Sequence, residues 1–202
     1  MRRLYEGVVR SRILYRAPVW AEDLMASRRS LLFLRRLQRT IAIRIVRGYR
    51  TISYASASVV AASPQYELQA LAHRRVYEHL RDLGSDGLTP SIASRPAQDV
   101  RTEANLGSWE RWRSRLLEDD VMRPHRGVRA ILPNWKPWRG RGGVPLTYWT
   151  TQMLTGHGAF GEFLLRIRRE ATSICHHCKE EEDTAQHNLE FCPAWEEPRR
   201  IL

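Results

Sequence analysis

Three cysteines and one histidine near the end of the chain have the spacing of metal ligands: Cys175, Cys178, His187 and Cys192. Two cysteines separated by two residues can bind one ion from a tight turn. With four residues between them, His187 and Cys192 are expected to lie on one face of a helical turn. Three thiolates and one imidazole complete a tetrahedral zinc site. The sequence therefore predicts one zinc ion with a structural rather than a catalytic role.

These ligands define a zinc-knuckle-like module over residues 171–202. Such a short segment has little core of its own, so we expect zinc to supply much of its folding free energy. Asp183 or Thr184 would cap the short helix that carries the histidine ligand. His176 or His177 could compete as a ligand, although residues inside a Cys-x2-Cys turn usually point away from the ion. The alternative is three unrelated thiols, which so charged a segment makes a poor core.

Other residues that could do chemistry are few. The acidic cluster Glu118–Asp120 has no apolar strand beside it to hold two carboxylates around magnesium, and we interpret it as a solvated helix end. His157, in a turn between two glycines, could act as a general base, but a single histidine in a turn is more often structural. No glycine-rich phosphate loop or nucleophile turn is recognisable. We therefore assign no catalytic residue and no small-molecule substrate.

The chain is strongly basic, and most of its excess charge lies in one region. Its 202 residues carry a net charge of +11. Residues 1–50 hold 13 arginines and three acidic residues, a net of +10. Arginine binds phosphate through paired hydrogen bonds and stacks on bases, so this region favours RNA or DNA as a partner. The alternatives are an acidic protein partner or a surface kept basic for solubility.

The hydrophobic pattern predicts a mostly α fold, a helical body followed by the small C-terminal zinc knuckle. Helices are expected over residues 5–15, 22–46, 53–62, 66–83, 97–118, 146–154 and 160–169, with irregular segments at 84–96 and 122–145. We divide the chain into a basic helical region (1–84), a linker with a second helical region (85–170) and the zinc module (171–202).

The helix expected over residues 22–46 has two unlike faces. Its apolar stripe consists of Leu34, Leu37, Ile41 and Ile45. The opposite face collects the arginines that we expect to contact nucleic acid, namely Arg28, Arg29, Arg35, Arg36, Arg39 and Arg47. The alternative is an ordinary solvated face.

A second candidate contact lies in the segment Trp135–Arg141. Its cations Arg139 and Arg141 alternate with tryptophans that could stack on unpaired bases. A tryptophan pair of this kind more often covers a core.

No run of about 18 apolar residues is present, so no membrane partner is expected. Arg10, Arg12 and Arg16 interrupt the apolar stretch that a signal peptide would need. We expect an intracellular, unprocessed protein, in which three cysteines are unlike a disulfide framework.

Several segments, which occur in the same order as in the family, resemble the C-terminal part of the reverse transcriptase polyprotein of arthropod non-LTR (LINE-type) retrotransposons, the ribosomal-DNA-inserting group. These segments are Ile13–Trp20, Arg36–Arg39, Tyr49–Ser53, Leu154–Phe160 and the cysteine–histidine cluster with Phe191-Cys192-Pro193 at its end. The resemblance implies that residues 1 to about 80 follow the polymerase palm as thumb and connecting helices. It also implies that the zinc knuckle holds template RNA or target DNA.

The family's polymerase and endonuclease centres are not recognisable here. We therefore expect a fragment, a degenerate copy or an incomplete gene model, inactive as a polymerase alone. The expected partners are RNA, DNA or the palm of the parent polyprotein, in the nucleus or in a cytoplasmic ribonucleoprotein. The alternative function is a structural zinc module that docks on another protein through the apolar stripe and exposed tryptophans. A third is a metal-dependent enzyme.

Overall fold

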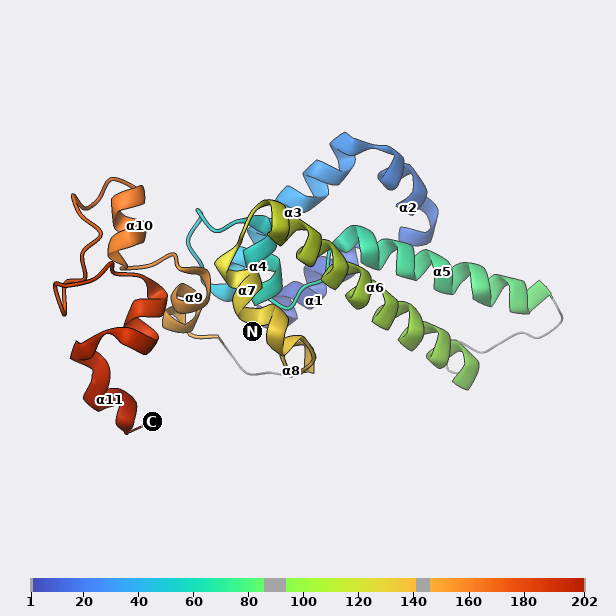
Figure 1. The fold of residues 1–202 in the computed structure, drawn as a ribbon. Coiled ribbons are helices and arrows are strands. Elements are labelled where there is room, and N and C mark those ends of the chain that lie inside the picture. Colours follow the sequence, from blue (N-terminus) through green and yellow to red (C-terminus); the bar gives the residue numbers. More distant parts are fainter. Residues whose placement is uncertain (1, 86–93, 141–145, 202) are drawn as a thin grey trace.

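The computed structural model describes residues 2–85, 94–140 and 146–201. In this part of the chain the elements are helical, and the only strand-like feature is one antiparallel bridge between Ile174 and Glu182. The mostly α prediction is confirmed. Figure 1 shows a long antiparallel pair, α5 and α6, extending from one end of the molecule. The C-terminal segments lie at the other end, beyond α9.

The helices follow one another in chain order. They are α1 (Arg2–Ile13), α2 (Ala17–Ala26), α3 (Arg28–Val46), α4 (Tyr54–Val60), α5 (Tyr66–Ser85), α6 (Arg95–Met122), α7 (Arg126–Ile131), α8 (Trp135–Gly140), α9 (Tyr148–Thr155), α10 (Gly161–Arg166) and α11 (Glu196–Arg200). Shorter turns are the 3-10 turns Leu132–Asn134 and Pro193–Trp195 and a π-helical turn, His187–Phe191.

The stretch expected as one helix over residues 22–46 is instead divided between α2 and α3. Ser27 separates them with an extended backbone (φ −106°, ψ 100°), and its hydroxyl accepts a hydrogen bond from the Ser30 amide at 3.2 Å. This is an N-cap, which favours the start of a new helix. Pro18 lies in the first turn of α2, where its missing N–H removes no helical bond. The break frees α2 to pack along α5.

The buried face of α3 is rotated from the predicted stripe. Leu37 is 46% exposed, whereas Gln38 is fully buried. The Gln38 amide nitrogen donates to the Pro64 carbonyl at 2.8 Å. Its oxygen accepts from the Tyr54 hydroxyl at 2.7 Å and from the Tyr66 amide at 3.1 Å. A polar group can be buried when its hydrogen bonds are made, and a search for apolar periodicity does not find such a position.

The segment 122–145, expected to be irregular, is largely helical where it is described. Trp135 opens α8 and is buried against Trp109 and Trp112, with ring centroids 5.6 and 5.3 Å apart. The indole N–H of Trp138 donates to a backbone carbonyl of α4 at 2.8 Å. These tryptophans therefore belong to the core, the more common role for such a pair.

The largest core joins helices from the first two predicted regions. It contains buried residues of α3, α4, α5, α6, α7 and α8: Ala42, Val46, Ala57, Val59, Val60, Leu68, Trp112, Leu116, Val128, Ile131 and Trp135, with Ile52 and Ala61 from the connections. A second cluster lies between α2, α3 and α5 and includes Ala17, Ile41 and Tyr66. The division of the chain at residue 84 stays a prediction.

None of the helices described combines the length and apolar character that crossing a membrane would require.

Candidate metal centre and nucleic-acid interface

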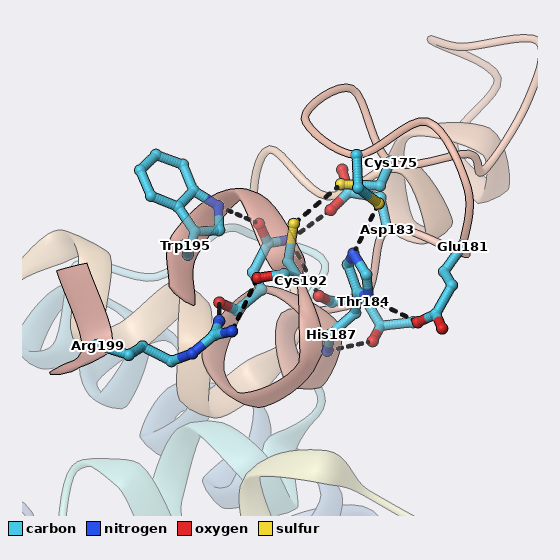
Figure 2. Close-up of polar contacts among 10 residues, drawn as sticks. Cys175, Glu181, Asp183, Thr184, His187, Cys192, Trp195 and Arg199 are labelled. Atoms are coloured by element: carbon cyan, nitrogen blue, oxygen red, sulfur yellow. Dashed lines mark hydrogen bonds and ion pairs between the residues drawn. The ribbon is translucent and has the colours of Figure 1, made fainter. Parts of the chain in front are cut away.

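The four predicted metal ligands meet at one point of the structure. The ligand atoms of Cys175, Cys178, His187 and Cys192 all lie within 4.8 Å of one another. The Cys175 and Cys192 sulfurs are 3.9 Å apart, and the Cys178 sulfur is 3.4 Å from His187 Nε2. Neighbouring sulfurs in a tetrahedral zinc–thiolate site lie about 3.8 Å apart, given bonds of about 2.3 Å. The arrangement could therefore hold one tetrahedral metal ion (Figure 2).

Backbone hydrogen bonds shape the turn that carries the first two cysteines. The Lys179 amide donates to the Cys175 carbonyl at 2.9 Å, and the Cys175 amide donates to the Glu181 carbonyl at 2.8 Å. Lys179 has a left-handed backbone (φ 62°), which reverses the chain directly after the second cysteine. The turn thus aims both thiols at one side without help from a large core.

His187 and Cys192 are placed by a π-helical turn. They lie on one side of it as expected, but a regular α-helical turn would not bring them together. Residues five apart on a regular α-helix point about 140° away from each other. Instead, the Cys192 amide donates to the His187 carbonyl at 2.7 Å, a π-type bond that brings the two residues onto one side. The Thr184 hydroxyl caps the start of this helix by accepting from the His187 amide at 2.9 Å, and Arg199 donates to the Cys192 carbonyl at 2.8 Å (Figure 2).

A carboxylate behind His187 orients its ring. Glu181 Oε2 lies 2.9 Å from His187 Nδ1. That contact favours the tautomer that carries its proton on Nδ1 and leaves the Nε2 lone pair facing the thiols. Glu181 is the functional residue that the sequence analysis missed. Acidic residues are frequent in this loop, and their identity alone does not show which one meets the histidine.

The two sides of the site differ in thiol acidity. Backbone amides of Glu180 and Glu181 hydrogen-bond to the Cys178 sulfur and lower its pKa to about 7. Burial raises the pKa of the Cys192 thiol. A thiol binds a metal as its thiolate, so Cys178 is the better prepared of these two ligands in the absence of metal.

The histidines inside the cysteine pair do not join the group of four ligands. His176 is exposed and lies 3.3 Å from Glu170, and His177 packs edge-on against Trp195 with centroids 4.8 Å apart. This agrees with the expectation that residues within the turn point away from the ion.

Asp183 attaches residues 171–201, the metal module, to the helical body that precedes them. Its carboxylate accepts a hydrogen bond from the Gly161 amide at 2.8 Å, and its carbonyl accepts from the Glu162 amide at 3.1 Å. The carboxylate therefore caps α10. The π-helical turn that begins at His187 is capped by Thr184 instead. A small core of Phe160, Phe163 and Ala185 closes the junction.

Three proteins from insect retrotransposable elements are similar to this chain over nearly its full length. They are the 115 kDa protein in type-1 retrotransposable element R1DM of Drosophila melanogaster and the retrovirus-related Pol polyproteins from element R1 4 of Nasonia vitripennis and element R1 of Bradysia coprophila. Identity is 27%, 26% and 24%, over 99%, 98% and 98% of this chain. The chain is a homologue of R1 retrotransposon Pol polyproteins. The predicted resemblance is thereby confirmed.

The chain spans 20%, 50% and 20% of the length of those three relatives. No family model matches the chain. No solved structure matches it.

The predicted arginine face of the R1 homologue contains two kinds of residue. Arg35 pairs at 2.8 Å with the fully buried carboxylate of Glu67. Arg39 donates to the Ile52 carbonyl at 2.7 Å and also to the Arg50 carbonyl. Both guanidinium groups thus hold the body together, and they are not simply displayed to a ligand.

The remaining arginines of this face are solvent-exposed: Arg28, Arg29, Arg36 and Arg47. Within the described residues none of these four makes an ion pair. The guanidinium groups of Arg29 and Arg36 lie 5.7 and 6.0 Å from the ring of Phe33, which is itself 55% exposed. This outer surface of α3 therefore mixes free positive charge with apolar side chains.

The second predicted contact region is only partly described. Arg139 lies 3.7 Å from Glu110, and Arg141 lies outside the described residues. The Glu118–Asp120 cluster is a helix end, as interpreted from sequence. Asp120 accepts from the His125 amide at 2.7 Å and pairs with Arg129 at 2.9 Å.

His157 is held between Thr51, in the connection from α3 to α4, and Arg166 of α10. Its Nδ1 lies 2.9 Å from the Thr51 hydroxyl, and Arg166 contacts Nε2 at 3.3 Å. Burial, reinforced by the Arg166 charge, lowers its pKa to about 4. Both ring nitrogens are engaged, which favours the structural interpretation of the glycine-flanked histidine over a general base.

A basic cleft between body and metal module also escaped the sequence analysis. Its volume is about 840 Å³, and its lining includes Arg126, Arg129 and Arg166, with Glu162 the one acidic residue among those that line it in the described chain. Arg126 donates to the Met153 carbonyl at 3.0 Å and to Gln186 at 3.1 Å, and so bridges the two parts. These arginines come from α7 and α10, and only the fold brings them together.

Proposed function

We propose that this region of an R1-type Pol protein binds RNA or DNA, and that one structural zinc ion orders its C-terminal module for that purpose. The exposed outer face of α3 carries the proposal, because it displays Arg28, Arg29, Arg36 and Arg47 without acidic partners in the described chain. Clustered arginines repel one another unless an anion neutralises them. A nucleic-acid backbone supplies such anions at regular intervals.

The donor set supports zinc as the metal. Three thiolates and one imidazole suit a borderline-soft ion that accepts tetrahedral geometry, whereas calcium and magnesium prefer oxygen ligands. No position of the set is left for substrate, so the ion would stabilise the module rather than catalyse. The basic cleft between the body and the module places three further arginines near this site: Arg126, Arg129 and Arg166.

The test is binding of labelled RNA and DNA to the zinc-loaded chain across a salt series. Each phosphate contact adds about 0.9 to the slope of log affinity against log salt on duplex DNA. The double variant Arg28→Gln/Arg29→Gln should lower that slope by about 2 and weaken all sequences alike. Arg81→Gln is the control, because Arg81 is also exposed but lies on α5 beside Asp82. A slope near zero in the unmodified chain would overturn the proposal.

A second candidate is protein docking, and the exposed apolar residues of α3 favour it. Leu32, Phe33 and Leu37 are 47%, 55% and 46% exposed. A polymerase palm of the parent polyprotein could cover such a face. Weak nucleic-acid binding together with a defined oligomer, measured by light scattering, would favour docking over the first proposal.

A further inference from the structure

A small pocket lies where α9 meets the metal module. Its volume is about 330 Å³, and two of the residues that line it are tryptophans. Trp149, in the first turn of α9, is 69% exposed, and Trp195, in the metal module, is 38% exposed. Trp195 is fixed by its indole N–H, which donates to the Asn188 side-chain oxygen at 3.3 Å (Figure 2). The ring of His177 also packs edge-on against it, with centroids 4.8 Å apart. Both parts of the protein thus supply aromatic surface to one pocket.

The same pocket is lined by a buried amide with an unused donor. Gln152 is 3% exposed, and its side-chain oxygen accepts from the Ala159 amide at 3.2 Å. That bond decides which end of the amide is nitrogen, because the flipped orientation would set one N–H against another. Gln152 Nε2 then has no hydrogen-bond partner among the described residues. A buried donor without a partner is unfavourable, so the pocket suits a ligand that brings an acceptor.

The pocket is also lined by a buried acceptor, the carboxylate of Asp183. Asp183 is 3% exposed. Its carboxylate accepts one bond from Gly161 and one from Asn188, and two carboxylate oxygens have room for about four. The residues that line the pocket therefore include an N–H donor, a spare acceptor and two tryptophans. This combination is complementary to a flat ligand with a carbonyl next to a ring N–H.

We propose that this pocket binds one unstacked nucleobase with a carbonyl next to a ring N–H, namely guanine, uracil or thymine. The inference rests on the proposed nucleic-acid function and deepens it. Aromatic side chains stack on the bases of single strands, and side-chain amides read base edges. The pocket is at the lower end of the range for small-ligand sites, roughly 300–1,000 Å³, so it suits one base. A single strand or an extruded nucleotide can deliver that base, whereas an intact duplex cannot.

The experiment uses the zinc-loaded chain, fluorescence anisotropy and labelled strands of equal length: oligothymidine, oligoadenosine and a strand whose sugars lack bases. Trp149→Ala should weaken oligothymidine binding about tenfold and leave the abasic strand unchanged, because only the stacking surface is lost. Tyr77→Ala is the matched control, since Tyr77 is an exposed aromatic residue (54%) on α5, outside this pocket. It should bind every strand as the unmodified chain does.

Gln152→Glu tests the edge contact separately. The carboxylate keeps an acceptor for the Ala159 amide but replaces the free donor with an acceptor. The preference for oligothymidine over oligoadenosine should therefore disappear in this variant while zinc binding persists. An unchanged preference would overturn the edge contact.

The outcomes separate this inference from the proposed function. Normal oligothymidine binding by Trp149→Ala would overturn the base pocket and leave salt-dependent backbone binding standing. Equal losses on oligothymidine and abasic strands would overturn it as well, because the effect would not depend on the base. If the unmodified chain bound none of the strands at any salt concentration, the proposed function itself would fail.

Discussion

A histidine that binds a metal must offer a lone pair from one nitrogen and keep its proton on the other. In His187 the 2.9 Å contact from Glu181 to Nδ1 assigns those roles, and Nε2 is left 3.4 Å from the Cys178 sulfur. The Glu181 side chain is 65% exposed, so it contributes little to packing. Its contribution is therefore expected in metal affinity rather than in stability of the body.

Replacing Glu181 by glutamine should weaken zinc affinity by roughly tenfold, since partners of ligating histidines commonly contribute 10- to 100-fold. Glutamine keeps a hydrogen-bonding oxygen but removes the negative charge that makes the imidazole more basic. Competition with a chromophoric chelator measures the change. Glu180→Gln is the control, because it removes the same charge from an exposed neighbour while leaving the backbone amide that contacts Cys178. Equal losses in both variants would show that overall charge, not the contact, matters.

Residue types and spacing were enough to predict which three cysteines and which histidine gather at one point, but not the residues that support them. Few other residue types can form a soft tetrahedral metal site, so this spacing of cysteines and histidine is specific for such a site. Gln38 shows the opposite case, because a buried glutamine breaks the apolar pattern and is explained only by its three partners in α4, in α5 and in the connection between them. Arg35 likewise has the sequence signature of a surface cation, yet it pairs with buried Glu67.

At the scale of elements, most of the longer helices followed from the sequence, whereas α7 and α8 did not. Helix ends depended on local hydrogen bonds, and the buried face of α3 depended on the bonds of Gln38 to residues far along the chain. Ser27 lies in a stretch that is helical on both sides, and only its cap shows that the chain starts again there. The π-helical turn at His187 is a similar case, since a regular helix would separate the two ligands. In both cases a local hydrogen bond decides between backbone geometries that residue propensity leaves nearly equal.

The junction between α10 and the metal module should be sensitive to one methyl group. A Cβ at Gly161 would lie 2.8 Å from the Ser173 carbonyl oxygen and 3.0 Å from Asp183 Cβ. Because backbone atoms cannot yield as a flexible side chain can, Gly161→Ala should destabilise the module by about 1–3 kcal/mol. The loss is measured on the zinc-loaded protein in increasing urea, with hydrogen exchange in residues 171–201 as the readout.

Gly7→Ala provides a control of opposite sign. Gly7 lies within α1, and nothing is within 4 Å of the position that its Cβ would take. Alanine there should stabilise the protein by up to about 1 kcal/mol through helix propensity. Similar effects of both substitutions would mean that the close approach at Gly161 does not constrain the module.

At the scale of the whole molecule, the two ends are stabilised by different means. The helical body has two clusters of buried side chains, and the larger one draws on helices from α3 to α8. The metal module has only Phe160, Phe163 and Ala185 in its buried cluster, and two of these belong to the body side of the junction. So small an apolar contact contributes little, and we therefore expect the ordering of the module to come mainly from a metal ion bound by its three cysteines and His187.

Removal of zinc by a chelator should therefore unfold one end of the molecule and leave the other intact. Hydrogen exchange should become fast in residues 171–201, while amides of α3 to α8 keep their protection and most of the helical circular dichroism remains. Cys178→Ser should show the fast exchange without chelator and respond little to it, since the site would already lack a thiolate. Restored zinc should return protection only to the unmodified chain. Unchanged protection of the module after chelation would contradict a structural metal, and loss of protection throughout would show that the body also depends on the ion.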